Sequence, residues 1–204
     1  MKVIAFNGSP RKGGNTQFMI EAVFKVLKSE GIETELFQLG GKLVHGCTAC
    51  NLCRKIQNGR CQIKNDVLNQ AIEKMIQADA IILGSPVYFG DVTTEIKALI
   101  DVAGYVTRSN GHLLARKVGA GVVAVRRAGM LHTFDTINNF FLINQMVVPG
   151  STYWNIGFGR EKGDVLNDEE GMKTMNDLGL NMAWLISRKR KRGSSFYNDL
   201  YINN

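Results

Sequence analysis

The chain has 204 residues and a mass of 22.6 kDa, which is the size of one domain with short appendages and is long enough to bury a core without disulfides. A composition of 45% hydrophobic and 21% charged residues excludes an intrinsically disordered protein. The formal net charge is +7, but residues 188–192 contribute five positive charges, so the domain itself does not present a strongly basic face.

A short apolar segment, Val3 to Phe6, opens the chain and is rich in strand-forming residues. It stops at the loop signal of residues 7–10, before it reaches the length of a signal peptide. No apolar run elsewhere approaches the roughly 18 residues of a membrane span. We therefore expect a cytoplasmic protein without a membrane anchor.

Helical and strand patterns alternate along the rest of the chain. Further strands are expected at residues 32–39, 80–83, 118–125 and 146–148. Helices are expected at residues 19–27, 92–103 and 134–145. Another helix should end at about Gln77, and the last should follow Asp168. The last helix carries a methionine-rich stripe that indicates core packing. Five β-α repeats predict an α/β domain with a doubly wound, five-stranded parallel sheet and helices on both faces.

Four unusual loops follow the first four strands. They are the glycine-rich residues 8–16, the cysteine-containing residues 40–61, residues 84–90 and residues 126–129. Because parallel strands end at the same edge of a sheet, we expect all four loops to lie along that edge, where ligands of such folds bind.

The glycine-rich loop has the composition of a phosphate site. Backbone N–H groups and the positive end of the following helix can meet an anion, and further donors are available from Ser9, Arg11, Asn15 and Thr16. A nucleotide P-loop is excluded because Gly14 and Asn15 stand where the lysine and hydroxyl residues belong, and Pro10 breaks the dinucleotide-binding pattern. The remaining alternatives are a site for a terminal phosphate without magnesium and a turn without a ligand.

The loops after the third and fourth strands can accept a planar ligand. Tyr88 and Phe89 place two aromatic rings where a strand has just ended, between Pro86 and Gly90. Arg126 and Arg127 follow the next strand, where they can either stabilise an anionic ring or pair with carboxylates.

All four cysteines lie within fifteen residues, at Cys47, Cys50, Cys53 and Cys61. Without a signal peptide, this clustering indicates metal or redox chemistry rather than disulfides. The two-residue gaps are those of ferredoxin cluster motifs, whereas structural zinc more often uses two separated Cys-x2-Cys pairs. The spacing therefore favours an iron-sulfur cluster, with zinc or free thiols as the alternatives.

Residues 8–16, 84–90 and 125–129 resemble the flavodoxin-like NAD(P)H-dependent FMN reductases. Together with the cysteines and residues 148–155, they resemble most the iron-sulfur flavoprotein branch of that family. The resemblance covers residues 1–187 and leaves residues 188–204 as a basic C-terminal tail. It implies a flavodoxin-like FMN-binding domain with strand order 2-1-3-4-5 and a cysteine-rich cluster loop at residues 40–62.

The resemblance also implies roles for particular residues. The FMN phosphate would be held by Ser9, Arg11, Asn15 and Thr16. The isoalloxazine ring would be bordered by Pro86, Val87, Tyr88, Phe89 and Gly90, and by Arg126, Arg127 and Gly129. A 4Fe-4S cluster would be bound by Cys47, Cys50, Cys53 and Cys61. No Ser-His-Asp arrangement or carboxylate pair indicates hydrolytic chemistry, and we assign no catalytic residue.

The leading interpretation is an FMN-dependent redox protein that couples flavin to a 4Fe-4S cluster for electron transfer. Its partner would be a ferredoxin or a reduced nicotinamide donor, and the family implies a homodimer or homotetramer. The first alternative is an NAD(P)H-dependent FMN or quinone reductase without a cluster. The second is a nucleic-acid-associated protein that binds through residues 188–192, but such a run is more often the solvated end of a helix.

Overall fold

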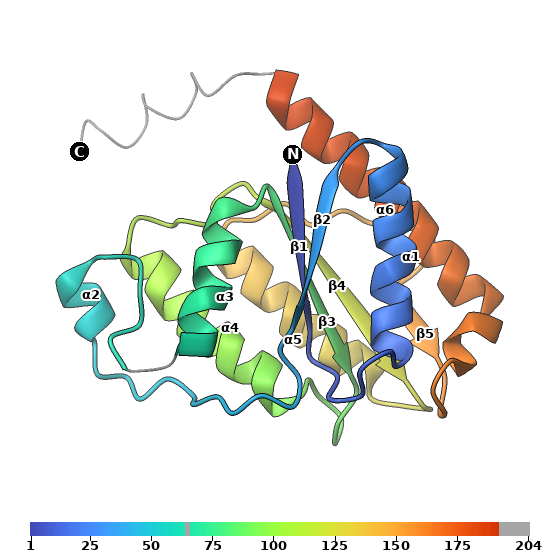
Figure 1. The fold of residues 1–204 in the computed structure, drawn as a ribbon, viewed down its shortest axis with the longest axis horizontal. Coiled ribbons are helices and arrows are strands. Elements are labelled where there is room, and N and C mark those ends of the chain that lie inside the picture. The colour runs from blue at the N-terminus through green and yellow to red at the C-terminus, as the bar shows by residue number, and fades with distance from the viewer. Residues whose placement is uncertain (64–65, 192–204) are drawn as a thin grey trace.

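The computed structural model describes residues 1–63 and 66–191. At its centre is a parallel sheet of five strands in the order β2-β1-β3-β4-β5 (Figure 1). The strands are β1 (Lys2–Asn7), β2 (Glu33–Gln38), β3 (Ala80–Pro86), β4 (Val118–Val125) and β5 (Ile156–Phe158). The strand order and the uniform direction confirm the predicted flavodoxin-like fold.

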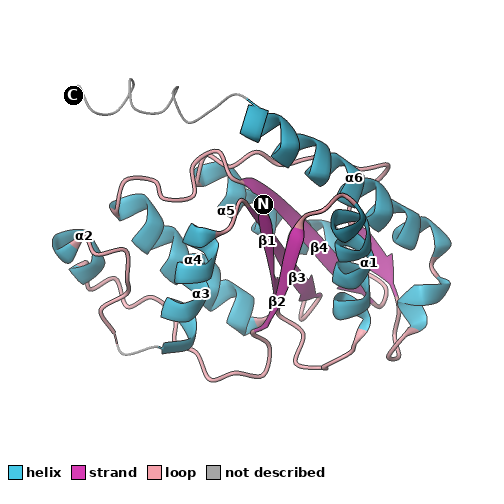
Figure 2. Ribbon diagram, turned by 45° about the horizontal axis from the view of Figure 1, so that its top comes forward, coloured by secondary structure: helices cyan, strands magenta, loops and turns pink. Residues whose placement is uncertain are grey.

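Helices cover both faces of the sheet (Figure 2). One layer consists of α1 (Asn15–Ser29) and α6 (Glu169–Lys191), and the other of α3 (Asp66–Gln77), α4 (Thr94–Ser109) and α5 (Met130–Ile143). The cysteine loop contains the short helix α2 (Leu52–Ile56), and the 3-10 helix η1 (Asp164–Asn167) precedes α6. Within the described ranges, every helix is too short or too polar to cross a membrane.

The central strands are buried on both faces, as their uninterrupted apolar sequences predict. In β1, Val3 and Ala5 face α1 and α6, whereas Ile4 and Phe6 face the three-helix layer, because successive side chains of a strand point in opposite directions. The methionine stripe on α6 is core packing, since Met175 and Met182 are fully buried in the layer that contains α1.

The position predicted for the fifth strand is wrong. Residues 146–148 were expected to form it, but Val147 makes only an isolated bridge to Val118, and β5 is formed by Ile156–Phe158 beside the carboxyl end of β4. Pro149 explains the difference, because a residue without an N–H cannot extend the hydrogen-bond ladder. The chain leaves the sheet there and returns with the next apolar segment.

The basic run begins inside α6 rather than after it. This helix continues to Lys191, and the guanidinium of Arg188 lies over the ring of Trp184, 5.5 Å from its centroid. Of the side chains in this run, the structure describes that of Arg188, which is exposed, and the role of the run stays a prediction. The remainder of the predicted tail, residues 192–204, lies outside the described residues.

Three glycines allow the backbones to meet at the carboxyl ends of the strands. Gly8 donates its N–H to the carbonyl of Gly84 at 2.8 Å, across the ends of β1 and β3. A Cβ at Gly84 would lie 2.6 Å from Cδ1 of Ile20 in α1, and a Cβ at Gly40 would lie 2.3 Å from the carbonyl carbon of Ser9. These contacts fix the glycine-rich loop against its two neighbouring strands.

We therefore predict that Gly84→Ala destabilises the protein by about 1–3 kcal/mol, because the added methyl group overpacks the contact with α1. Gly46→Ala is the matched control, since nothing lies within 4 Å of that position and the change should stay within about 0.5 kcal/mol. Urea unfolding of the two variants measures both free energies. Equal stability of the two variants would contradict the packing argument.

Candidate functional site

The glycine-rich loop, residues 8–16, leads into a helix whose first turn is open. Gly14 is the N-cap residue of α1, and no side chain of the described chain caps it. Ser9 is buried and its hydroxyl accepts the N–H of Arg11 at 3.2 Å, which tightens the loop. An uncapped helix N-terminus beneath a glycine-rich loop presents N–H donors and a positive dipole to an anion.

Thr16 and Asn15, the other two predicted phosphate ligands, differ in how their side chains are placed. Thr16 is buried in the first turn of α1. The side-chain amide of Asn15 donates to the carbonyl of Glu161 at 2.9 Å and accepts the N–H of Gly163 at 2.8 Å, so this side chain holds the loop between β5 and η1. The donors of Asn15 that remain for a phosphate are its backbone N–H and the second hydrogen of its side-chain amide.

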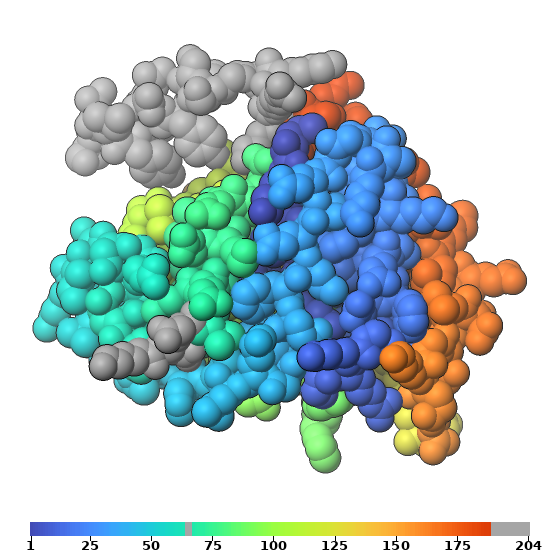
Figure 3. All heavy atoms as spheres, viewed as in Figure 1, coloured from blue at the N-terminus to red at the C-terminus, as the bar shows by residue number. Residues whose placement is uncertain are grey.

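The loop after β3 ends in a strained turn. Tyr88 and Asp91 exchange both backbone hydrogen bonds, and Phe89 and Gly90 between them have φ angles of 49° and 84°, as in a type I′ turn. Phe89 is fully exposed in this left-handed conformation, which is costly for an aromatic residue. The turn protrudes from the carboxyl edge of the sheet at the bottom of Figure 3. Such strain is typical of functional sites.

The loop after β4 meets this turn. Gly129 has a φ angle of 87°, and a Cβ there would lie 2.9 Å from Cα of Gly90 and 3.0 Å from Cγ1 of Val87. Arg126 and Arg127, which precede it, are exposed. The structure thus brings together two of the loops that the sequence separates by about forty residues.

These loops fit an FMN cofactor. The donors of the glycine-rich loop suit a phosphate, and the two loops that meet at Gly129 offer backbone groups and aromatic rings to a planar ring system. Thr93, which the sequence analysis did not identify, adds a buried hydroxyl without a hydrogen-bond partner among the described residues. It lies 2.9 Å from the position of a Cβ on Gly8, between the phosphate loop and α4.

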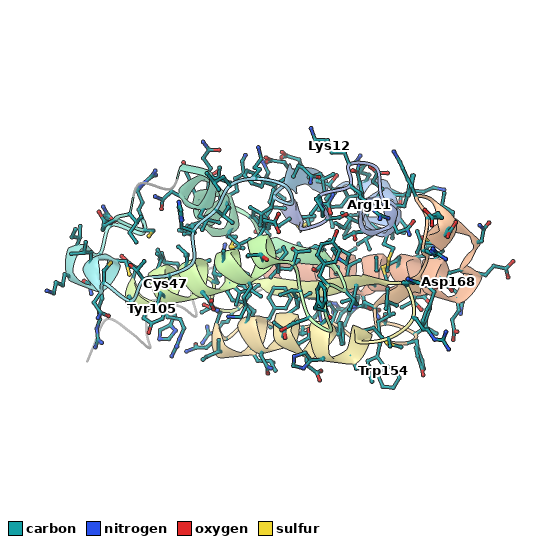
Figure 4. All side chains as sticks on the ribbon, turned by 90° about the horizontal axis from the view of Figure 1, so that it is seen from below. Arg11, Lys12, Cys47, Tyr105, Trp154 and Asp168 are labelled. Carbon is teal, nitrogen blue, oxygen red and sulfur yellow. The ribbon has the colours of Figure 1, made fainter. Side chains whose placement is uncertain are left out.

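The four cysteines line one pocket toward the other end of α4, together with Val102, Tyr105 and Val106 of that helix. Figure 4 shows Cys47 and Tyr105 side by side there. Cys53 is 8% exposed, and burial raises the pKa of its thiol, which the neighbouring thiols of Cys61, Cys47 and Cys50 raise further. Among the described residues, no three His, Cys, Asp or Glu side chains converge on one ion. A cubane cluster does not require this, since each thiolate binds a different iron.

Two side-chain amides, one buried and one half-buried, anchor the cysteine loop. Asn69 of α3 accepts the N–H of Cys61 at 2.8 Å and donates to its carbonyl at 2.9 Å. Asn110, after α4, donates to the carbonyl of Cys53 at 3.4 Å and accepts the N–H of Gly59 at 2.9 Å. These bonds fix the backbone around the two less exposed thiols.

Between these anchors the loop is strained. Ala49, Asn51 and Gln57 all have φ angles between 52° and 58°, in the left-handed region that side chains disfavour. Each such residue costs about 1–3 kcal/mol unless its surroundings compensate. The sequence did not reveal this feature, because none of the three residues is a glycine.

The cysteine loop starts at the common edge of the sheet but does not stay there. The loop begins at Gly40, which lies against Ser9 at this edge. The thiols instead lie against Val106, thirteen residues along α4 from Thr93. With 1.5 Å per helical residue, the part of the cysteine pocket at Val106 lies about 20 Å along α4 from Thr93 and the phosphate loop. The expectation that this whole loop lies on the edge is therefore wrong for the thiols themselves.

A family model described as NADPH-dependent FMN reductase matches residues 1–161. The chain is 39% identical over 198 residues to an iron-sulfur flavoprotein of Methanocaldococcus jannaschii, covering 94% of this chain and all of that relative. It is 34% identical over 195 residues to the iron-sulfur flavoprotein of Methanosarcina thermophila, covering 94% of this chain and 98% of the relative.

Among solved structures, a WrbA-like flavodoxin from Agrobacterium tumefaciens superimposes with a TM-score of 0.63 at 16% identity, over 92% of this chain and 97% of that one. This likeness concerns the fold. The sequence matches go further, because they extend over nearly the whole chain and agree with the flavin-binding loops described above. The chain is a flavin oxidoreductase that belongs to the NADPH-dependent FMN reductase family, in its iron-sulfur flavoprotein branch.

Proposed function

We propose that this oxidoreductase couples FMN to a 4Fe-4S cluster and transfers electrons between a two-electron and a one-electron partner. The observation that carries the proposal is the pocket in which four thiols meet on a strained, anchored loop. FMN can take up two electrons as a hydride, whereas an iron-sulfur cluster exchanges one electron at a time. A chain with both groups converts one type of electron transfer into the other.

The FMN phosphate is held by the backbone N–H groups of Lys12, Asn15 and Thr16 and by the guanidinium of Arg11, because the N–H groups of Ser9, Arg11, Gly13 and Gly14 already donate within the protein. The isoalloxazine ring lies against residues 86–90 and 126–129, whose contact at Gly129 closes one side of the site. Arg126 and Arg127 supply positive charge beside the ring, which stabilises its reduced, anionic form. Thr93 contributes a hydroxyl beneath the ring-binding loop.

Cys47, Cys50, Cys53 and Cys61 each bind one iron of the cluster. Ligation of the cluster compensates the strain at Ala49, Asn51 and Gln57, since the loop can close only on a group that its thiols grip. The amides of Asn69 and Asn110 hold the backbone of this loop before the metal binds.

The distance between the proposed flavin site and the cysteine pocket favours an oligomer. About 20 Å along α4 is a long path within one chain. A homodimer or homotetramer shortens the path by setting the cluster of one chain beside the flavin of another. The electron donor is a reduced nicotinamide or a ferredoxin.

An anaerobic assay of iron and acid-labile sulfide tests the proposal, together with the visible spectrum. The expected result is four irons and four sulfides per chain, with a broad iron-sulfur shoulder beside the flavin bands. A flavin spectrum without iron would instead support a cluster-free FMN or quinone reductase.

The phosphate site yields one prediction. Arg11→Ala should weaken FMN binding by a factor of about 10 to 100, because one charge-assisted contact of about 1.5–3 kcal/mol is lost. Arg108→Ala is the control, since this arginine is exposed near the far end of α4. Titration of the flavin-free protein measures both affinities, and unchanged FMN affinity of the Arg11 variant would exclude this residue from the site.

The cysteine pocket yields a second prediction. Cys50→Ser should abolish the cluster and leave FMN bound, because its loop packs on the far end of α4. Reduction of the flavin by a two-electron donor should survive, and transfer between FMN and a one-electron partner should slow sharply. Stopped-flow absorbance at matched FMN content measures both steps, with Thr48→Ser as the control in the same loop. Equal one-electron rates in an iron-free Cys50 variant would place the cluster off the path.

A further inference from the structure

The loop between β5 and η1, residues 159–163, lies directly over the glycine-rich loop. A Cβ on Gly13 would be 3.0 Å from Nζ of Lys162, so the lysine ammonium sits against the backbone of that loop. Nη1 of Arg11 donates to the carbonyl of Arg160 at 3.4 Å. Figure 4 shows Arg11 and Lys12 together at this end of the site. Two loops separated by almost the whole domain thus form one surface.

Side chains on two sides hold residues 159–163 in place. Asn15 bridges the carbonyl of Glu161 and the N–H of Gly163, as described above. From the other side, the carboxylate of Asp164 accepts the N–H groups of Arg160 and Glu161 at 3.1 and 2.7 Å. This loop is therefore anchored as firmly as a tight turn, and its position depends on the first residue of α1.

The surface formed by the two loops has an excess of positive charge. Arg160 lies beside the carboxylate of Glu161 at 3.3 Å, but among the side chains that the structure describes no carboxylate is within ion-pair distance of Arg11, Lys12 or Lys162. Three unpaired cations beside an uncapped helix N-terminus repel one another unless an anion lies between them. A phosphate monoester carries nearly two negative charges at neutral pH.

We propose that residues 159–163 complete the flavin phosphate site, with Lys162 as a further phosphate-binding residue and Asn15 as the residue that positions it. The inference rests on the proposed FMN site and adds a second loop that contacts the phosphate. The side chain of Asn15 then acts through the loop that it holds, rather than through a contact with the phosphate. Gly13 leaves the space in which the lysine ammonium reaches the anion.

The test compares FMN with riboflavin, which lacks the phosphate. Lys162→Ala in the full-length, flavin-free protein should weaken FMN binding about tenfold, as expected for one charge-assisted contact, and leave riboflavin affinity unchanged. Lys162→Arg should retain most of the FMN affinity. Lys25→Ala, which removes an exposed lysine ten residues along α1, is the matched control and should bind both flavins like the wild type.

The positioning role of Asn15 is measured by a double-mutant cycle. Asn15→Ala alone should reduce the preference for FMN over riboflavin, whereas in the Lys162→Ala background it should reduce that preference little further. Additive effects would show that Asn15 does not act through Lys162. FMN binding by the Lys162→Ala variant equal to that of the wild type, or equal weakening of FMN and riboflavin, would overturn the inference alone. A wild-type chain that binds no FMN would overturn it together with the proposed function.

Discussion

Gly8, Gly40 and Gly84 meet where β1, β2 and β3 end, and every part of the flavin site depends on that contact. The Gly8–Gly84 hydrogen bond sets the height of the phosphate loop, and Gly40 lies against the backbone of Ser9 from the other side. A side chain at any of the three would separate the loop from its neighbours or from α1. The chemistry of the site thus rests on the absence of side chains in one small region.

Beyond this contact, α4 connects the phosphate loop to the cysteine pocket. Its N-cap, Thr93, lies beside Gly8, and Val106, near its other end, lines the cysteine pocket. A single helix of sixteen residues therefore sets both the separation and the relative orientation of the two sites. Because α4 packs on the sheet along its length, a shift of one site would require the helix to move as a whole.

The sequence predicted the sheet well because its central strands are uninterrupted apolar runs, each followed by an unmistakable loop. It failed for the fifth strand, where residues 146–148 and 156–158 both have strand-forming composition and only the effect of Pro149 on the ladder separates them. Asn15 shows a different limit, since the sequence predicts a phosphate ligand there but does not reveal that its side chain also bonds to the distant residues 161 and 163. The left-handed Ala49 and Phe89 carry no sequence signal, because neither alanine nor phenylalanine favours positive φ angles, whereas Asn51 belongs to a residue type that tolerates them.

The cysteine loop is joined to the domain by its two ends, by the amides of Asn69 and Asn110, and by packing on the outer side of α3 and α4. Of these attachments, the end at Gly40 lies against the phosphate loop, whereas the two amides and the packing on α4 lie away from it. The proposed cluster site is therefore physically separable from the phosphate loop. A change confined to residues 47–61 would alter the proposed metal site without reaching the contact between Gly8, Gly40 and Gly84.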